Sequence, residues 1–271
     1  MPELPEITVI ANQMNKTLKD KRIAKSEVFQ PRILNVPVAE FVKNVMGKTV
    51  ESVTSKGKWL FVKLKPAFFL LINLGMGAEL LYLTPKLKAP EKVQFRLTFS
   101  DKSRVAIHFW WFGYVHLVAE KNLPSHKMTA TLGIEPTSGA FTFRNFKDIL
   151  RSRKTTVKTS LLEQKNIAGI GNVYVQDILF RARLHPNRKL QTLSESEIKA
   201  LYSVIKTVLN KSIELGGLAY ELDFYGRKGK FDQDKFLVGY KTGKPCPECG
   251  AKIEKIKTGS TSSYICPKCQ V

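Results

Sequence analysis

Four cysteines near the end of the chain carry the clearest chemistry in the sequence. They form two C-x2-C pairs, Cys246 with Cys249 and Cys266 with Cys269. Zn²⁺ prefers four such ligands in a tetrahedron, and each C-x2-C turn aims two thiolates at one point. A disulfide-stapled secreted chain spreads its cysteines more widely, so zinc is favoured over two disulfides or a redox pair. Because four sulfurs close the coordination shell, we expect one structural zinc that this small region needs in order to fold.

A glycine-rich turn indicates a second chemistry, the binding of phosphate. Gly169 and Gly171 lie within residues 164–180, which read as a helix end, a turn and a new helix. We expect Asn172 at the N-cap of the new helix, whose first N–H groups point outward and can bind phosphate. An ordinary connection between two helices would give the same pattern. Three nearby lysines add positive charge: Lys154, Lys158 and Lys165.

The charge of the whole chain favours a polyanionic partner. Lys and Arg total 44 against 23 acidic residues, which gives 271 residues a net charge of +21. Neutralising phosphates releases condensed counterions, so DNA or RNA is the natural partner, although a merely basic protein remains an alternative. The sequence contains no apolar run long enough to span a membrane and no signal peptide at its start, so we expect a cytoplasmic protein.

The elements that would position these residues change in character along the chain. Ile7, Ile10, Met14 and Leu18 recur at helical spacing after Pro5 and predict a leading helix. Six stretches are then typical of strands and suggest an antiparallel sandwich or flattened barrel: 22–29, 48–64, 68–74, 78–83, 93–99 and 104–118.

The second half of the chain has a helical pattern. Residues 145–157 and 194–214 predict helices, the second with a capping box formed by Ser194 and Glu197. Gly216 and Gly217 would end that helix. The four histidines show no metal-ligand spacing, and we interpret them as structural.

Five motifs occur in one order along the chain: Met-Pro-Glu-Leu-Pro-Glu at its start, Lys-Gly-Lys-Trp-Leu around Lys58, Leu-Gly-Met-Gly around Met76, Ile-Gly-Asn-Val-Tyr around Asn172, and the cysteine pairs. With them the chain resembles the formamidopyrimidine-DNA glycosylase / endonuclease VIII family along its whole length. The resemblance implies an α+β fold. Its parts would be an N-terminal catalytic β-sandwich with a leading helix (1–125), a helix–two-turn–helix DNA-binding domain (140–222) and a zinc-ribbon β-hairpin (235–271).

The resemblance also implies a mechanism. A penultimate proline permits removal of Met1, and the exposed amine of Pro2 would attack the sugar C1′, expel a damaged base and leave a Schiff base. The strand would then be cut by β- or δ-elimination. Glu3 would handle protons, Glu6 would support the site, and Lys58 and Asn172 would bind phosphate.

Three departures from the family bear on specificity. Met76 and Phe112 match side chains that many members insert into the duplex, but Trp110 stands where those members have an arginine that pairs with the orphaned base. Trp110 offers one N–H donor, so reading of an opposite cytosine is not expected. Thr261 stands near the position of an arginine that grips phosphate. Residues 220–243 are divergent and short, so specificity for 8-oxoguanine is not expected.

We therefore expect a monomeric glycosylase and AP lyase of base excision repair that acts on damaged DNA. In a prokaryote it would associate with the nucleoid. Lys154 and Thr261 are expected among the DNA-binding residues. The rival hypotheses are a protein of the same fold with weakened catalysis that binds damaged or abasic DNA, and a zinc-ribbon protein that binds RNA.

Overall fold

The computed structural model describes residues 2–88 and 90–271, apart from the side chain of Gln233. The chain divides into two compact units. The first runs to Thr131 and also includes Gly216–Lys230; the second comprises Leu132–Leu215 and Phe231–Val271. The α+β fold expected from the sequence is confirmed. No helix in the described part of the chain has the length and apolar character needed to cross a membrane.

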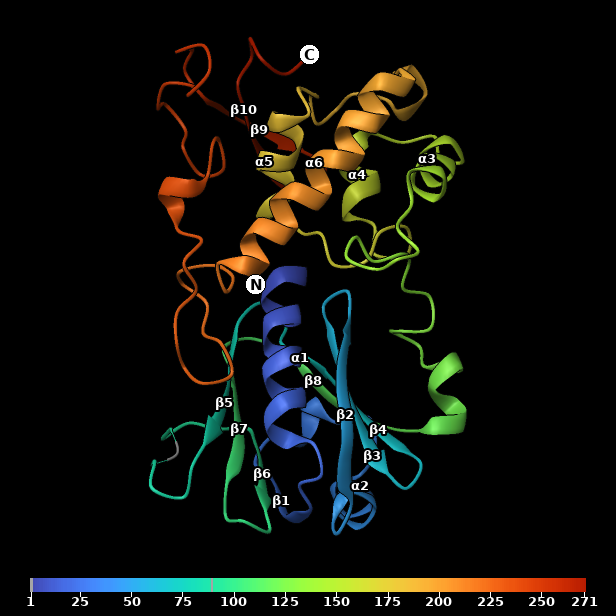
Figure 1. Cartoon of the computed structure of the whole chain (residues 1–271), viewed down its shortest axis with the longest axis vertical. Coiled ribbons are helices and arrows are strands. Elements are labelled where there is room, and N and C mark those ends of the chain that lie inside the picture. The colour runs from blue at the N-terminus through green and yellow to red at the C-terminus, as the bar shows by residue number, and fades with distance from the viewer. Residues whose placement is uncertain (1, 89) are drawn as a thin grey trace. The chain divides into compact units, whose positions relative to one another are not determined.

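Unit 1 is built on two antiparallel sheets of four strands each (Figure 1). The first sheet has the order β1-β6-β7-β5: β1 (Ile23–Val28), β6 (Phe95–Phe99), β7 (Arg104–Phe109) and β5 (Ala78–Leu83). The second has the order β2-β3-β4-β8: β2 (Thr49–Lys56), β3 (Trp59–Lys65), β4 (Phe68–Asn73) and β8 (Tyr114–Ala119). The predicted stretches 48–64 and 104–118 each contain two strands, because turns at Gly57 and Gly113 interrupt them.

The two sheets share one apolar core with the leading helix. In α1 (Leu4–Leu18) the four apolar positions that predicted the helix are all buried. The helix packs along β2, and its apolar stripe joins side chains from both sheets in a single cluster. Phe224 from the returning segment 216–230 belongs to the same cluster. Short helices complete the unit: η1 (Pro31–Ile33), α2 (Val38–Val45) and η2 (Glu120–Ser125).

Unit 2 is helical and ends in a β-hairpin. Its elements are α3 (Phe143–Arg151), α4 (Val157–Leu162), α5 (Tyr174–Arg181), η3 (Leu190–Thr192), α6 (Glu195–Glu214), η4 (Gln233–Lys235), β9 (Glu254–Thr258) and β10 (Thr261–Ile265). The capping box of α6 is confirmed, since Ser194 Oγ accepts the N–H of Glu197 at 3.2 Å and Glu197 accepts the N–H of Ser194 at 2.7 Å. Gly216 and Gly217 follow the helix with φ of 75° and 86°. Such angles suit glycine and stop the helix.

Candidate active site and nucleic-acid interface

The start of α1 is buried and held from two sides. Pro2 and Glu3 are both buried, Glu3 completely, and Met1 lies outside the described residues. Glu6 accepts the N–H of Glu3 with Oε2 at 2.9 Å and the N–H of Leu218 with Oε1 at 3.0 Å. The carboxylate of Glu6 therefore fixes the first turn of α1 against the returning segment 216–230.

Lys58 lies in the two-residue turn between β2 and β3 and is half-buried. The Asn73 side chain links this turn to the loop that carries Met76: its Nδ2 donates to the carbonyl of Lys58 at 2.9 Å, and its Oδ1 accepts the N–H of Gly75 at 3.0 Å. Gly75 has a φ of 58°, and a Cβ there would lie 1.4 Å from the carbonyl oxygen of Phe112. Only glycine allows this approach of the Met76 and Phe112 loops. Asn73 was not singled out from the sequence, because one asparagine at a strand end carries no recognisable signal.

Four large apolar side chains are exposed at these two loops. Met76 and Phe112 are each 54% exposed, Trp110 64% and Trp111 80%. The indole of Trp110 stacks on the ring of His108, with the ring centroids 6.0 Å apart. Exposed aromatic and thioether groups in this number are unusual on a surface that only meets water.

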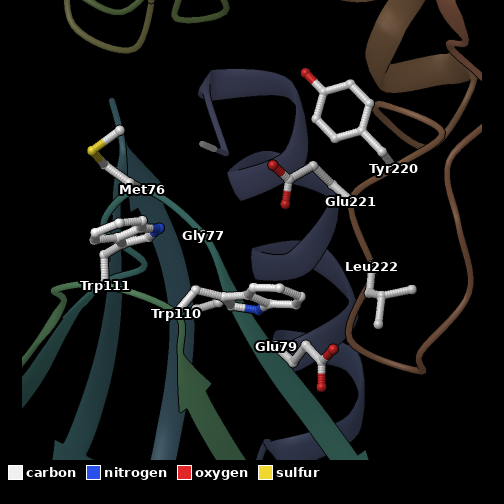
Figure 2. A pocket seen from close by; sticks show the side chains of 9 residues that line it. Met76, Gly77, Glu79, Trp110, Trp111, Tyr220, Glu221 and Leu222 are labelled. Carbon is white, nitrogen blue, oxygen red and sulfur yellow. The ribbon is translucent and has the colours of Figure 1, made fainter.

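A cavity of about 260 Å³ adjoins these loops within unit 1. Met76, Trp110 and Trp111 line it on one side (Figure 2). Glu79 of β5 and residues Tyr220, Glu221 and Leu222 of the returning segment complete the lining. The cavity thus combines flat apolar faces with carboxylates, a combination that suits a nucleobase with amino groups on its edge.

The glycine-rich turn lies in unit 2, and the prediction that Asn172 caps the next helix is wrong. The N-cap of α5 is Val173, which has helical angles and makes no side-chain cap. The backbone and side-chain oxygens of Asn172 instead accept hydrogen bonds from Gln176 Nε2 at 2.9 and 3.1 Å. The reason is that the turn extends one residue further, so the Asn172 side chain reaches forward along α5. Gln164 holds the turn, accepting the N–H of Gly169 at 2.8 Å.

Gln176 joins this turn to the zinc hairpin. It is buried, donates to the carbonyl of Ser262 at 3.3 Å and accepts the N–H of Tyr264 at 3.0 Å. The neighbourhood of Asn172 and that of Thr261 are therefore parts of one braced structure within unit 2. A glutamine inside an amphipathic helix gives no such signal in the sequence.

Lysines near the turn differ in environment. Lys154 is exposed, as the prediction of a DNA contact requires. Lys158 is only 2% exposed and lies under the hairpin, so any charge that it adds near the turn comes from a buried side chain. It is one of the buried residues of α4, together with Val157 and Leu161.

The four cysteines fit a zinc ion. Their sulfur atoms all lie within 4.8 Å of one another, with 3.9 Å between Cys246 and Cys269 and 3.4 Å between Cys249 and Cys266. Tetrahedral Zn–S bonds of about 2.3 Å would place the sulfurs about 3.8 Å apart. A disulfide requires about 2.05 Å, so these distances exclude one. The site holds one structural zinc, because four thiolates leave no open position for a substrate.

Comparisons with known proteins agree with this arrangement. The formamidopyrimidine-DNA glycosylase N-terminal domain matches residues 1–132, its H2TH domain residues 132–223, and the zinc finger found in FPG and IleRS residues 243–271. The formamidopyrimidine-DNA glycosylases of Protochlamydia amoebophila and Bacillus subtilis are 35% and 32% identical to the chain. Both alignments cover 100% of this chain and 99% of the relative.

Solved structures give the same result. The Lactococcus lactis Fpg bound to DNA with an abasic site superposes with a TM-score of 0.91 at 30% identity, covering 99% of both chains. The same enzyme with DNA containing Fapy-dG gives a TM-score of 0.89 over the same share of both chains. With three family domains matched in order and relatives aligned over its full length, the chain belongs to the formamidopyrimidine-DNA glycosylase family and is a DNA N-glycosylase of base excision repair.

Proposed function

We propose that Pro2, after removal of Met1, is the nucleophile of a combined glycosylase and AP lyase reaction. The lone pair of the proline nitrogen forms a bond to C1′, and the N-glycosidic bond breaks with its electrons leaving on the base. Loss of the proton from nitrogen and opening of the sugar ring give an iminium. This iminium acidifies the neighbouring C2′ proton, and elimination of the 3′ phosphate and then of the 5′ phosphate cuts the strand.

The fixed start of α1 is the observation that carries this proposal. Glu6 holds the N–H of Glu3, so the residue next to Pro2 cannot shift without breaking a buried hydrogen bond. The positive end of the helix dipole disfavours an ammonium at this position, whereas the nearby carboxyl groups of Glu3 and Glu6 favour it. The buried carboxyl group of Glu3 is assigned the proton transfers at the sugar.

The remaining predicted site residues are assigned to DNA. Lys58, Lys154, Asn172 and Thr261 bind phosphates, while Met76, Trp110 and Phe112 enter the duplex beside the lesion. The Lactococcus lactis Fpg has been solved in complex with DNA that contains Fapy-dG, an oxidized pyrimidine or an abasic site. We assign the same lesion classes to this chain, without strict reading of the opposite base.

The sandwich (1–125) carries the chemistry, and segments 140–222 and 235–271 bind DNA. The enzyme acts as a monomer, in the cytoplasm, on the nucleoid.

Borohydride trapping tests the proposal directly. A preparation in which mass spectrometry shows Met1 removed should form a covalent adduct with abasic or oxidised-base DNA, because borohydride reduces the iminium. Pro2→Gly should reduce trapping strongly, whereas the exposed Pro37→Gly should not. Absence of an adduct from the processed protein, together with tight binding to an abasic analogue, would instead establish the non-catalytic binding protein.

A further inference from the structure

Lys158 is a buried lysine to which the proposed reaction assigns no role. Four oxygen atoms of the zinc hairpin lie within hydrogen-bond distance of the Lys158 Nζ, which has three N–H donors to share among them: Thr258 Oγ1 and Thr261 Oγ1, each at 2.9 Å, and Ser262 O and Ser263 Oγ, each at 2.8 Å. Each of these contacts is a hydroxyl or carbonyl oxygen. Within residues 2–88 and 90–271 no ion pair to Lys158 is found, so its positive charge is solvated by dipoles and is not neutralised by a carboxylate.

The charge persists at neutral pH. Burial lowers the pKa of Lys158 to about 8, which still lies above neutral pH, so the ammonium form predominates. A neutral amine has two protons, whereas four oxygens lie at bonding distance, which also favours the ammonium.

The hydroxyl groups of the hairpin transmit the effect of this charge to the surface through polarised hydrogen bonds. A hydroxyl oxygen that accepts a hydrogen bond from an ammonium must direct its own hydrogen elsewhere. Thr261 directs its hydrogen to the carbonyl of Thr258 over a long 3.2 Å, and a better acceptor would displace that contact. Hydrogen bonds in such a chain polarise one another, so the Thr261 hydroxyl is a stronger donor than an ordinary threonine.

A cavity of about 480 Å³ lies at this place and is rich in hydroxyl groups. Thr156, Thr159, Asn187, Ser260 and Thr261 line it together with Lys158. Glu163 also lines it and is exposed to solvent, where water screens its charge. Hydroxyl and amide donors that line this cavity, together with a cation that has no ion pair among the described residues, suit an anion with several acceptor oxygens.

We propose that Lys158 supplies the positive charge with which the hairpin tip, residues 258–261, binds a phosphate of the DNA backbone, and that the Thr261 hydroxyl makes the contact. The charge at the tip thus comes from beneath it, because residues 258–261 themselves carry no charged side chain. The inference rests on the proposed function in so far as the ligand is DNA. Lys158 is a positioning residue, since it acts through Thr261.

Salt dependence separates this role from simple support of the fold. Each phosphate neutralised by a cation changes the slope of log affinity against log salt by about 0.9. The probe is a duplex with a tetrahydrofuran abasic analogue, which binds but cannot form the Schiff base. Lys158→Met is expected to weaken binding about tenfold and to reduce the slope by about one. Lys199→Met, an exposed lysine of α6 in the same unit, is the matched control and should leave both nearly unchanged.

Two further variants keep the test decisive. Thr261→Val removes the hydroxyl but keeps the lysine, and should reproduce the slope of Lys158→Met. Lys158→Met combined with Thr261→Arg should restore the slope, because a charge then stands on the tip itself.

Zinc content and melting temperature are measured for each variant. A slope for Thr261→Val equal to that of the unmodified protein overturns the proposal, even if Lys158→Met does not fold. Borohydride trapping at low salt should persist in Thr261→Val, so failure here differs from failure of the proposed reaction.

Discussion

Glu6 joins the first turn of α1 to a segment 212 residues away in the sequence. Each of its two carboxylate oxygens accepts one backbone N–H, at Glu3 and at Leu218. Such bonds to a charged acceptor are stronger than neutral ones, and both are buried. The residue beside the proposed nucleophile is therefore held in place by an acid to which the proposed reaction assigns no bond-making step.

Replacing this acid by its amide should show how much the placement matters. Glu6→Gln keeps the size but offers one acceptor oxygen, so its NH₂ group faces one of the two N–H donors. We expect a loss of about 1–3 kcal/mol in the free energy of unfolding. We also expect slower borohydride trapping on abasic DNA, because Pro2 is no longer fixed. Thermal melting and single-turnover trapping measure the two effects. Glu40→Gln, exposed on α2, is the control. Unchanged trapping in Glu6→Gln would contradict a positioning role.

At the scale of elements, the helices and strands followed from the sequence more readily than the turns between them. The stripe from Ile7 to Leu18 and the capping box of α6 depend on local spacing, which the sequence shows directly. The position of Asn172 outside the N-cap was missed, because a one-residue extension of a turn depends on Gln164 and Gln176 packing against it. Burial of Lys158 was missed since it depends on a hairpin 100 residues later in the chain.

The candidate site was predictable to the extent that its residues belong to local motifs. Pro2, Glu3 and the cysteines stand in such motifs. Asn73 and Glu6 Oε1 act through partners that only the folded chain brings near, and a single sequence without tertiary contacts cannot reveal them.

A contact between His116 of strand β8 and His126, which follows η2, should make unit 1 sensitive to acid. His116 is buried, its Nδ1 lies 3.0 Å from Nε2 of His126, and its ring lies against Trp59. Burial, with a smaller contribution from the charge on His126, lowers the pKa of His116 to about 4. The unfolded chain binds a proton near pH 6.5 while the folded chain does not, so stability is full above pH 6.5 and falls towards pH 4.

The expected loss over this window is about 3 kcal/mol, since one pKa unit corresponds to about 1.4 kcal/mol. Urea unfolding followed at several pH values between 7 and 4 measures it. His116→Gln should flatten the profile, because glutamine does not titrate. His185→Gln, in unit 2, should retain the fall. Subtracting the pH profile of His116→Gln from that of the unmodified protein removes the acid sensitivity of the zinc site, because both proteins contain that site. Equal slopes in all three proteins would show that His116 does not contribute.

The zinc hairpin is the element that metal removal should disorder. Its apolar cluster is small, with Phe180, Val238, Ile253 and two of the cysteines, so the metal supplies much of its stability. Chelation should increase hydrogen exchange in β9 and β10 and weaken DNA binding, because Lys158 loses its four acceptors. All three tryptophans of the chain lie at positions 59, 110 and 111, in unit 1. Their fluorescence should stay unchanged and serves as an internal control. A change in tryptophan fluorescence on chelation would contradict a loss of order that is confined to the hairpin.

For the molecule as a whole, the net charge of +21 and the uncharged loops with Met76, Trp110 and Phe112 should contribute to different properties. Phosphate contacts provide affinity that does not depend on the base, and they weaken with salt. Stacking contacts at the lesion depend on an open space in the duplex and are insensitive to salt. Affinity and preference for damaged DNA should therefore separate when the ionic strength changes.

Anisotropy titrations with an intact duplex and with one carrying a tetrahydrofuran site test this separation. Four phosphate sites are proposed, and a cation serves three of them (Lys58, Lys154 and Lys158 beneath the hairpin tip), so the slope of log affinity against log salt should be about −3. Affinity for both duplexes should then fall roughly fiftyfold between about 50 and 200 mM salt. Their ratio should stay constant, because the stacking side chains do not exchange counterions. Trp110→Ala should reduce the ratio without changing the slope, whereas Lys199→Met should change neither. A ratio that falls with rising salt would mean that charge, and not the exposed aromatic loops, recognises the lesion.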